Sequence, residues 1–462
     1  MTLHVVLIST YELGRQPFGL ASPAAWLREA GALVSCLDLA VERLNEDAIA
    51  AADLVAFYVP MHTATRLAAS FVDRVRRINS TAHLCFYGLY APVNEEYLRG
   101  LGARTILGGE FEEGLVALVE RLSANEKNTA PAPSQMEPIV SLAKQRFRVP
   151  DRGQLPSLEQ YAHVKLPDGT RRVVGYTEAS RGCKNLCRHC PIVPVYGGRF
   201  FVVQADVVLE DIARQVASGA QHITFGDPDF FNGPTHAMRI VEELHRRFPD
   251  LSYDVTIKVE HLLRHRGHLP ALRDTGCLFV TSAVEAVDDR ILEIFDKHHT
   301  REDFVRVVSL CRKVGLNLNP TFVTFNPWIS LAGYRDLLST ILELDLVGSV
   351  SPIQYAIRLL IPRESRLLEL PLVQEFVGEF DPAALAYPWT HPDARMDLLH
   401  EEVLPVVGGT LAGEEDRYAN FARVWELTEA ASAAISSDPF ALFATRIKSR
   451  EPIPHLSEPW YC

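Results

Sequence analysis

The chain has 462 residues, a formal net charge of −12 and 47% hydrophobic residues, enough for about two to four domains with their own cores. The acidic balance and the absence of a long Lys/Arg run argue against a nucleic-acid partner. The first residues show neither a basic leader nor an apolar run near the ~18 residues that a membrane span requires. We therefore expect a cytoplasmic protein with no membrane partner.

The first 124 residues alternate between apolar strands and helices. This alternation predicts an α/β domain with an open, doubly wound parallel sheet, which binds ligands beyond the carboxyl ends of its strands. Tyr11, Gly108 and Gly109 lie at those ends, and a Gly-Gly pair before a helix allows a ligand to approach the backbone closely. The expected strands are residues 3–9, 32–37, 54–59, 83–88 and 104–109, and the expected helices are residues 23–30, 64–78 and 113–122.

A polar, Pro-containing stretch at residues 125–155 predicts a linker. A second βα series then fills residues 156–375, and its six units predict a partial (β/α)6 barrel with active residues on the loops after the strands. Residues 376–462 predict a small mixed region with a helix at 414–436 and a Pro-rich tail. The expected barrel strands are residues 173–178, 222–225, 252–257, 277–284, 317–325 and 353–360, and the helices between them include 206–217, 237–248, 301–314 and 331–344.

Three of the eight cysteines, Cys183, Cys187 and Cys190, form a C-x3-C-x2-C motif directly after the first strand of the second series. Three thiolates on one loop can hold three irons of a [4Fe–4S] cluster and leave the fourth iron without a protein ligand. A structural zinc site is the alternative, but it requires four ligands, and His189 could be the fourth only with strain. Gly182 allows the loop to turn tightly.

Two arginines accompany the cysteines: Arg181 precedes Cys183, and Arg188 lies between Cys187 and Cys190. Either they supply positive charge to a cluster held by anionic thiolates, or they are ordinary solvated surface residues.

The cysteine motif in this strand context resembles the radical S-adenosylmethionine (SAM) superfamily. The resemblance implies an enzyme whose free iron chelates the amino and carboxylate groups of SAM and whose reduced cluster cleaves it. It also implies a small-molecule substrate and an electron donor such as flavodoxin or ferredoxin. No residue pattern in the chain identifies the substrate.

Further cofactor-binding residues follow from the same resemblance. Residues 222–230 resemble the second-strand segment that meets the SAM amino group, which implicates Asp227 or Asp229. Residues 282–286 resemble the fourth-strand segment near the ribose and implicate Glu285, whose alternative role is that of a surface or helix-capping acid. Arg358, near the end of the sixth strand, can bind a carboxylate of SAM or substrate through a bidentate pair.

A doubly wound domain ahead of such a barrel resembles the cobalamin-binding class of the superfamily, which implies cobalamin as a cofactor and methyl transfer as the reaction. The loop after the first strand, residues 11–15, has no histidine, so it offers none as a lower axial ligand. The alternatives are that this domain packs on the barrel and binds nothing, or that the whole protein is a noncatalytic iron–sulfur or cobalamin sensor.

The chain ends at Cys462 after an apolar, aromatic tail. This ending and the layout of the chain resemble the CUAEP/CCAEP-tail radical SAM proteins, in which a terminal Cys is followed by selenocysteine or Cys and then Ala-Glu-Pro. The resemblance implies a catalytic Cys462 beside a selenocysteine, a pair that can capture a thiophilic species such as trivalent arsenic. Transfer of the aminocarboxypropyl group of SAM to arsenite is thus an alternative reaction. A tail merely docked by Trp460 is the other alternative.

The tail resemblance predicts the coding DNA beyond Cys462. We expect an in-frame UGA codon followed by codons for Ala, Glu and Pro, because a selenocysteine codon read as a stop would end the chain here. Sequencing the gene checks this. A different stop codon, or unrelated downstream codons, would remove the two-residue capture site.

Overall fold

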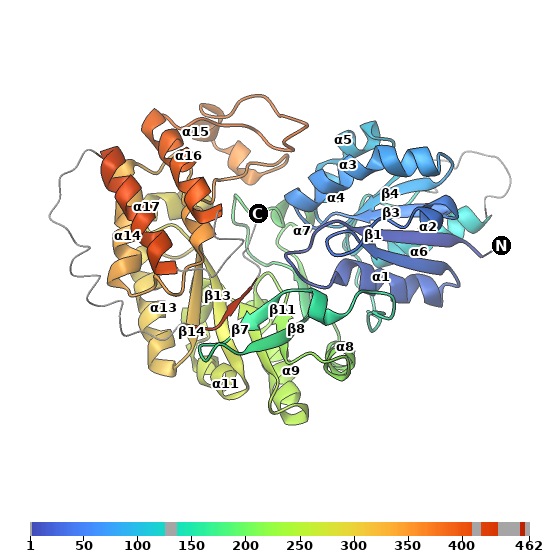
Figure 1. Cartoon of the computed structure of the whole chain (residues 1–462), viewed down its shortest axis with the longest axis horizontal. Coiled ribbons are helices and arrows are strands. Elements are labelled where there is room, and N and C mark those ends of the chain that lie inside the picture. Colours follow the sequence, from blue (N-terminus) through green and yellow to red (C-terminus); the bar gives the residue numbers. More distant parts are fainter. Residues whose placement is uncertain (1, 125–135, 409–416, 433–452, 458–462) are drawn as a thin grey trace.

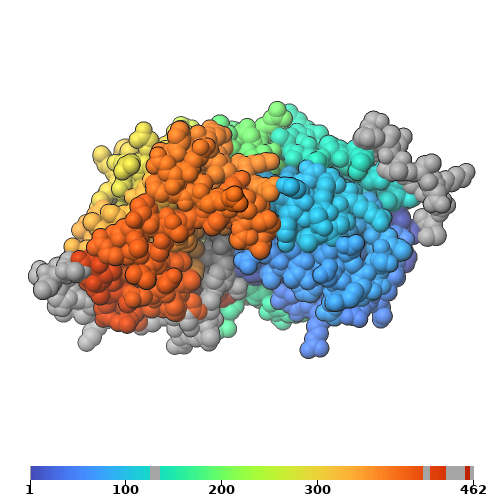
Figure 2. All heavy atoms as spheres, turned by 90° about the horizontal axis from the view of Figure 1, so that it is seen from above, coloured from blue at the N-terminus to red at the C-terminus, as the bar shows by residue number. Residues whose placement is uncertain are grey.

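The computed structural model describes residues 2–124, 136–408, 417–432 and 453–457. A blue N-terminal sheet domain lies beside a green and yellow barrel, and orange C-terminal helices pack against the yellow side of the barrel (Figure 1). Seen from above, the orange C-terminal region meets the blue domain (Figure 2). There Nε2 of His62 lies 2.5 Å from the carbonyl oxygen of Ala384, and Arg363 pairs with Glu96. None of the described helices is long and apolar enough to cross a membrane.

The N-terminal domain has the predicted doubly wound parallel sheet. The strand order is β2-β1-β3-β4-β5-β6, and one apolar core lies on each face of the sheet. The order reverses between β1 and β3, which is where open sheets of this kind bind ligands. The strands are β1 His4–Ser9, β2 Leu33–Asp38, β3 Leu54–Tyr58, β4 His83–Tyr87, β5 Thr105–Gly109 and β6 Val140–Ser141, and the helices are α1 Phe18–Glu29, α2 Glu46–Ala50, α3 His62–Ile78, α4 Tyr90–Val93, α5 Glu95–Gly100 and α6 Glu112–Ala124.

Helix α1 begins at Phe18, five residues before the predicted start at Pro23. A proline inside a helix leaves the carbonyl four residues earlier without its usual donor. Here that carbonyl belongs to Gly19, and the hydroxyl of Tyr87 donates to it at 2.8 Å. The tertiary contact therefore allows a helix that the local sequence does not predict.

The second sheet has seven strands in the order β14-β13-β12-β11-β8-β7-β15. Strands β8 and β11 to β14 are parallel, whereas β7 runs antiparallel to β8 and β15 antiparallel to β7. The strands are β7 His163–Lys165, β8 Arg171–Thr177, β11 His222–Phe225, β12 Ser252–Thr256, β13 Cys277–Glu285, β14 Asn317–Phe322 and β15 His455–Leu456, and the helices around them are α8 Ala205–Ala217, α9 Pro234–Arg247, α10 Val259–Arg264, α11 Leu269–Asp274, α12 Asp289–Phe295, α13 Arg301–Val314 and α14 Leu331–Glu343.

The sixth barrel strand, predicted at residues 353–360, is reduced to a single bridge between Phe325 and Arg358. The segment begins instead as a 3-10 helix, Pro352–Tyr355. Pro352 has no backbone N–H for a ladder, and the side-chain oxygen of Gln354 accepts from the amide of Phe322 at 2.8 Å. A side chain thus replaces the strand that would have paired with the end of β14.

The predicted linker and tail both contribute strands. Val140–Ser141, within the expected linker 125–155, forms β6 of the first sheet, and His455–Leu456 forms β15 at the edge of the barrel. Residues 125–135 of the linker lie outside the described residues. The predicted helix at 414–436 contains α17; the C-terminal region also includes α15 Pro371–Gln374 and α16 Ala394–Gly408, and α17 spans Arg417–Ser432.

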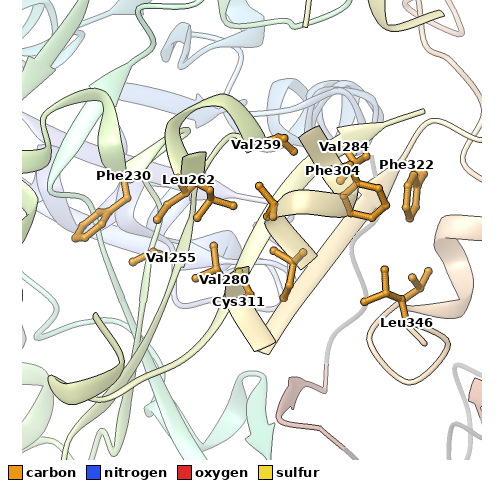
Figure 3. Close-up of a cluster of buried hydrophobic side chains, with 14 of the residues drawn as sticks. Phe230, Val255, Val259, Leu262, Val280, Val284, Phe304, Cys311, Phe322 and Leu346 are labelled. Atoms are coloured by element: carbon orange, nitrogen blue, oxygen red, sulfur yellow. The ribbon is translucent and has the colours of Figure 1, made fainter. Parts of the chain in front are cut away.

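The main apolar core fills the space between the barrel strands and their helices. Figure 3 shows part of it, where Val280 of β13 lies near Cys311 of α13. Cys311, Cys277, Cys36 and Cys85 are all buried in the apolar cores, where free cysteines are commonly found.

A buried ion cluster joins the two domains. Arg181, only 6% exposed, contacts Glu112 of α6 through two bonds of 2.7 and 2.9 Å and Glu178 through one of 2.7 Å. Nη1 of Arg181 also lies 3.5 Å from Glu110. Burial alone would raise the pKa of Glu112, but the charge of Arg181 outweighs it and holds that pKa below its usual value. The cluster thus keeps a carboxylate ionised inside the domain contact.

Replacing Arg181 by methionine should destabilise the protein by about 3–5 kcal/mol, because it leaves buried carboxylates without their cation. Urea unfolding of the apo-protein measures the loss. Arg246→Met is the matched control, since Arg246 forms an exposed pair with Glu243 within one helix, and its unfolding midpoint should barely move. Equal stability of the two variants would show that the buried cluster contributes nothing beyond a surface pair.

Candidate active site

The cysteine loop follows β8 and is framed by a small hairpin of β9 Ser180–Gly182 and β10 Phe200–Val202. Gly182 has a φ of 70°, and a Cβ atom there would lie 2.5 Å from the carbonyl oxygen of Arg199. Only glycine fits such a position without strain. The predicted role of Gly182 in the turn is therefore confirmed.

The three cysteines fit the ligand set of a [4Fe–4S] cluster. Cys187 is buried, and Cys183 and Cys190 are half-buried. The backbone and side-chain nitrogens of Asn185 each lie 3.5 Å from the sulfur of Cys183, where they donate to it. Hydrogen bonds to the sulfurs stabilise thiolate ligands and tune a cluster. Among the described residues, no three His, Cys, Asp or Glu side chains are placed to hold one metal ion, whereas a cluster takes one thiolate per iron.

The two arginines near the cysteines are neither cluster counter-ions nor plain surface. Arg181 belongs to the interdomain ion cluster. Arg188 donates to the carbonyl oxygens of Glu293 and Ile294, at 2.9 and 3.0 Å, near the C-terminus of α12. Cations are favourable at that end of a helix, so Arg188 ties the cysteine loop to the barrel.

Glu285 lies at the end of β13. A bulge in the pairing with β14 and a φ of 70° turn the backbone there, and bulges of this kind redirect a side chain. The carboxylate lies 3.2 Å from Lys297 and 3.2 Å from His189 of the cysteine loop. Burial would raise its pKa, but Lys297 and then His189 outweigh burial and lower the pKa to about 2. Glu285 is thus a fixed negative charge beside the loop and not a surface or capping acid.

The two aspartates after β11 differ in placement. Asp227 accepts from the amide of Ala179 at 2.9 Å and from the hydroxyl of Ser180 at 2.5 Å, and it lines the cavity described below. Burial raises its pKa to about 7. Asp229 instead lies 2.6 Å from Nδ1 of the buried His261, outside the cavity wall. The structure therefore favours Asp227 of the two candidates.

Arg358 does not reach the site. Its guanidinium pairs with Asp397 at 2.8 Å, donates to the carbonyl of Trp389 at 2.8 Å, and stacks 3.7 Å from the centroid of that indole ring. The prediction of a ligand carboxylate for Arg358 is wrong, because the C-terminal region supplies a carboxylate that the strand pattern could not reveal.

Contacts with other protein atoms explain why glycine is required at both positions of the pair at the end of β5. A Cβ at Gly108 would lie 2.1 Å from Pro92, and one at Gly109 would lie 2.2 Å from the carbonyl oxygen of Ser141. Gly109 does line the cavity, but Gly108 and Tyr11 do not. The predicted close approach of a ligand is therefore not what requires these glycines. Cys462 lies outside the described residues.

One cavity of about 470 Å³ joins the two domains. Its wall contains three predicted residues of the barrel (Cys190, Asp227 and Glu285) and the loops after β1, β3 and β5 of the N-terminal sheet. The carboxyl ends of both sheets therefore open onto the same space. Wall residues of the N-terminal domain are Glu12, Leu13, Arg15, Phe18, Tyr58, Pro60, Met61, Leu89, Gly109 and Phe111.

The sequence reasoning missed four residues of this site: Glu12, Arg15, His189 as a partner of Glu285, and Lys297 as the buried cation. Glu12 and Arg15 had only their position after a first strand, which does not distinguish them from other loop residues.

Residues 177–328 match the family model of the Radical SAM superfamily. The matched segment starts at the end of β8 and includes the three cysteines, Asp227 and Glu285. The chain thus contains a radical SAM domain.

Similarity extends beyond that domain. The chain is 22% identical over 191 residues to the ribosomal protein uS12 methylthiotransferase RimO of Bacteroides fragilis, covering 38% of this chain and 42% of RimO. It is 25% identical over 331 residues to the hopanoid C-3 methylase of Methylococcus capsulatus, covering 68% of this chain and 62% of that enzyme. The chain therefore spans less than two thirds of either relative.

A solved structure of OxsB, a cobalamin-dependent S-adenosylmethionine radical enzyme with aqua-cobalamin and S-adenosylmethionine bound, superposes with a TM-score of 0.73. The identity is 13%, and the match covers 96% of this chain and 75% of OxsB. At this identity the match shows a shared fold, which includes both the N-terminal domain and the barrel.

Replacing Cys183, Cys187 and Cys190 together by alanine should abolish iron uptake. Anaerobic reconstitution of the unchanged protein with iron and sulfide should give about four irons per chain, the content of one [4Fe–4S] cluster. Cys311→Ala is the control, because this buried thiol lies in the core away from the loop, and it should keep its iron. A triple variant that still took up four irons would disprove the assignment.

Proposed function

We propose that this protein is a cobalamin-dependent radical SAM transferase that modifies a small molecule, with methyl transfer as its reaction. The observation that carries the proposal is the single cavity into which the N-terminal sheet and the cysteine loop both open. A group held by the first domain would face the cluster and SAM in the second. The fold shared with OxsB and the relationship to methyl-group-transferring enzymes support the same reading.

The residues of the chain would have separate roles in this reaction. Cys183, Cys187 and Cys190 would hold the cluster, and the fixed charge of Glu285 would orient the ribose side of SAM from the end of β13. Asp227 already accepts two hydrogen bonds, from Ser180 and Ala179. Its carboxylate has further lone pairs, with which it would accept from the SAM amino group. When bound, the cluster supplies an electron that cleaves SAM, and cobalamin supplies methyl-transfer chemistry.

The barrel part of the wall suits an uncharged substrate. Thr256, Thr281 and Thr321 line the cavity from three adjacent strands. Two acids of that half already pair with cations: Glu178 with Arg181, and Glu285 with Lys297. The third acid, Asp227, would be taken by the SAM amino group, so the described part of that wall leaves no carboxylate for a charged substrate group.

Product analysis tests the proposal. Protein produced with cobalamin, purified without oxygen and reduced with dithionite or flavodoxin should carry stoichiometric corrinoid and consume SAM. The matched control is the triple cysteine-to-alanine variant, which should keep the corrinoid, because the N-terminal domain holds it, and lose SAM turnover.

The other outcomes separate the alternatives. Corrinoid without SAM consumption indicates a sensor, and SAM consumption without corrinoid makes the first domain a scaffold and removes methyl transfer through cobalamin. Release of methylthioadenosine when arsenite is added would instead indicate aminocarboxypropyl transfer, the reaction implied by the Cys462 ending. Any of these three results contradicts the proposal.

A further inference from the structure

Two charged side chains of the cavity wall each have one buried atom without a hydrogen-bond partner among the described residues. Oε2 of Glu12 and Nε of Arg15 are both buried and unpartnered among the described residues. Glu12 is only 6% exposed. Leaving such groups unsatisfied is unfavourable, so each of them needs a partner from outside the chain, either a bound molecule or water.

Both groups belong to one turn of the loop after β1. The amide of Arg15 donates to the carbonyl oxygen of Glu12 at 2.9 Å, and the Arg15 guanidinium lies 4.9 Å from the ring centroid of Tyr176 in β8. Within the described part of the chain, no ion pair of 4.0 Å or less joins the two side chains. They are thus close in sequence, line the same cavity and are not paired with each other.

The charges on the cavity wall determine which kind of chemical group could bind to Glu12 and Arg15. Burial, and next the nearby charge of Glu178, raise the pKa of Glu12 well above its ordinary value, so its carboxyl group is favoured in the neutral form. An anionic group would meet the acids Glu12, Glu178 and Asp227 on the same wall. A cationic group would leave Arg15 without an acceptor. A primary carboxamide satisfies both, since its NH₂ donates to Glu12 and its oxygen accepts from Arg15.

We propose that Glu12 and Arg15 bind one peripheral carboxamide of the corrin ring of cobalamin. Cobalamin carries such carboxamides around its ring, and the two residues follow β1, beside the β1/β3 switch point at which open sheets bind ligands. The assignment rests on the proposed cobalamin dependence. It adds which residues recognise the periphery of the cofactor, and through which chemical group.

Equilibrium binding of hydroxocobalamin to the apo-protein, followed by visible absorbance, tests the assignment without any turnover. Glu12→Leu and Arg15→Leu should each weaken binding about tenfold, because each leaves one side of the amide unpaired. Glu12→Gln should bind within about twofold of the unchanged protein, since an amide side chain keeps both a donor and an acceptor. Glu113→Leu and Arg77→Leu, at exposed positions of the same domain, are matched controls that should bind normally.

A chemically modified cofactor provides a second binding experiment. Among cobalamins in which one peripheral carboxamide is hydrolysed to a carboxylate, one isomer should bind about tenfold more weakly to the unchanged protein, and Glu12→Leu should reduce that discrimination. If the unchanged protein binds cobalamin and both leucine variants bind it equally well, the assignment is wrong and water satisfies the two groups. If the unchanged protein binds no cobalamin at all, the proposed function itself fails. Thermal unfolding of each apo-variant confirms that a loss of binding is not a loss of fold.

Discussion

The buried contact of Arg181 with Glu110, Glu112 and Glu178 is the interaction on which the geometry of the site depends. Arg181 lies two residues before Cys183, while Glu110 and Glu112 frame the start of α6 in the other domain. A guanidinium removed from water requires nearly all its donors to be paired, so the domains cannot slide apart without a large penalty. The cysteine loop and the first sheet are consequently held in one fixed relation, and the cavity between them has a defined shape.

Which polar groups are available for ligands depends on which ones already have hydrogen-bond partners within the protein. Ser22 and Gln145 complete the shell around Glu112, and Lys297 and His189 complete that around Glu285. The carboxylates of Glu112 and Glu285 are thus paired by protein atoms. Glu12 and Arg15, in the loop after β1, instead each keep one buried side-chain atom without a partner among the described residues.

Much of this architecture could be read from the sequence, because both domains have strong local signals. Apolar runs such as residues 54–59 and 83–88 are buried on both faces, and their short, continuous apolar stretches predict buried strands. The spacing of the three cysteines likewise indicates the ligand set of a [4Fe–4S] cluster. Glu285 and Asp227 could be located only through the family resemblance, since a single acid after a strand has no distinguishing pattern.

The parts that sequence reasoning missed depend on contacts between distant residues. Whether Arg358 faces a ligand or Asp397 is decided by a region 39 residues further along the chain. Helix α1 continues across Pro23 because a tyrosine 68 residues away from Gly19 supplies the missing donor. Glycine is required at Gly109 because a Cβ there would meet the carbonyl oxygen of Ser141 in β6. Strand β6 was not predicted, because residues 125–155 have the polar composition of a linker. Such constraints have no local signature.

The pairing of β15 with β7 has a consequence for how the protein is made. The amide of Ser457 donates to the carbonyl of His163, 294 residues earlier in the chain. While the ribosome is still synthesising the intervening residues, β7 presents its outer edge unpaired, and an open strand edge invites association with other chains. The sheet of the barrel therefore gains β15 only after the residues that separate the two strands have been made, and chains that stop before β15 would be released with that edge exposed.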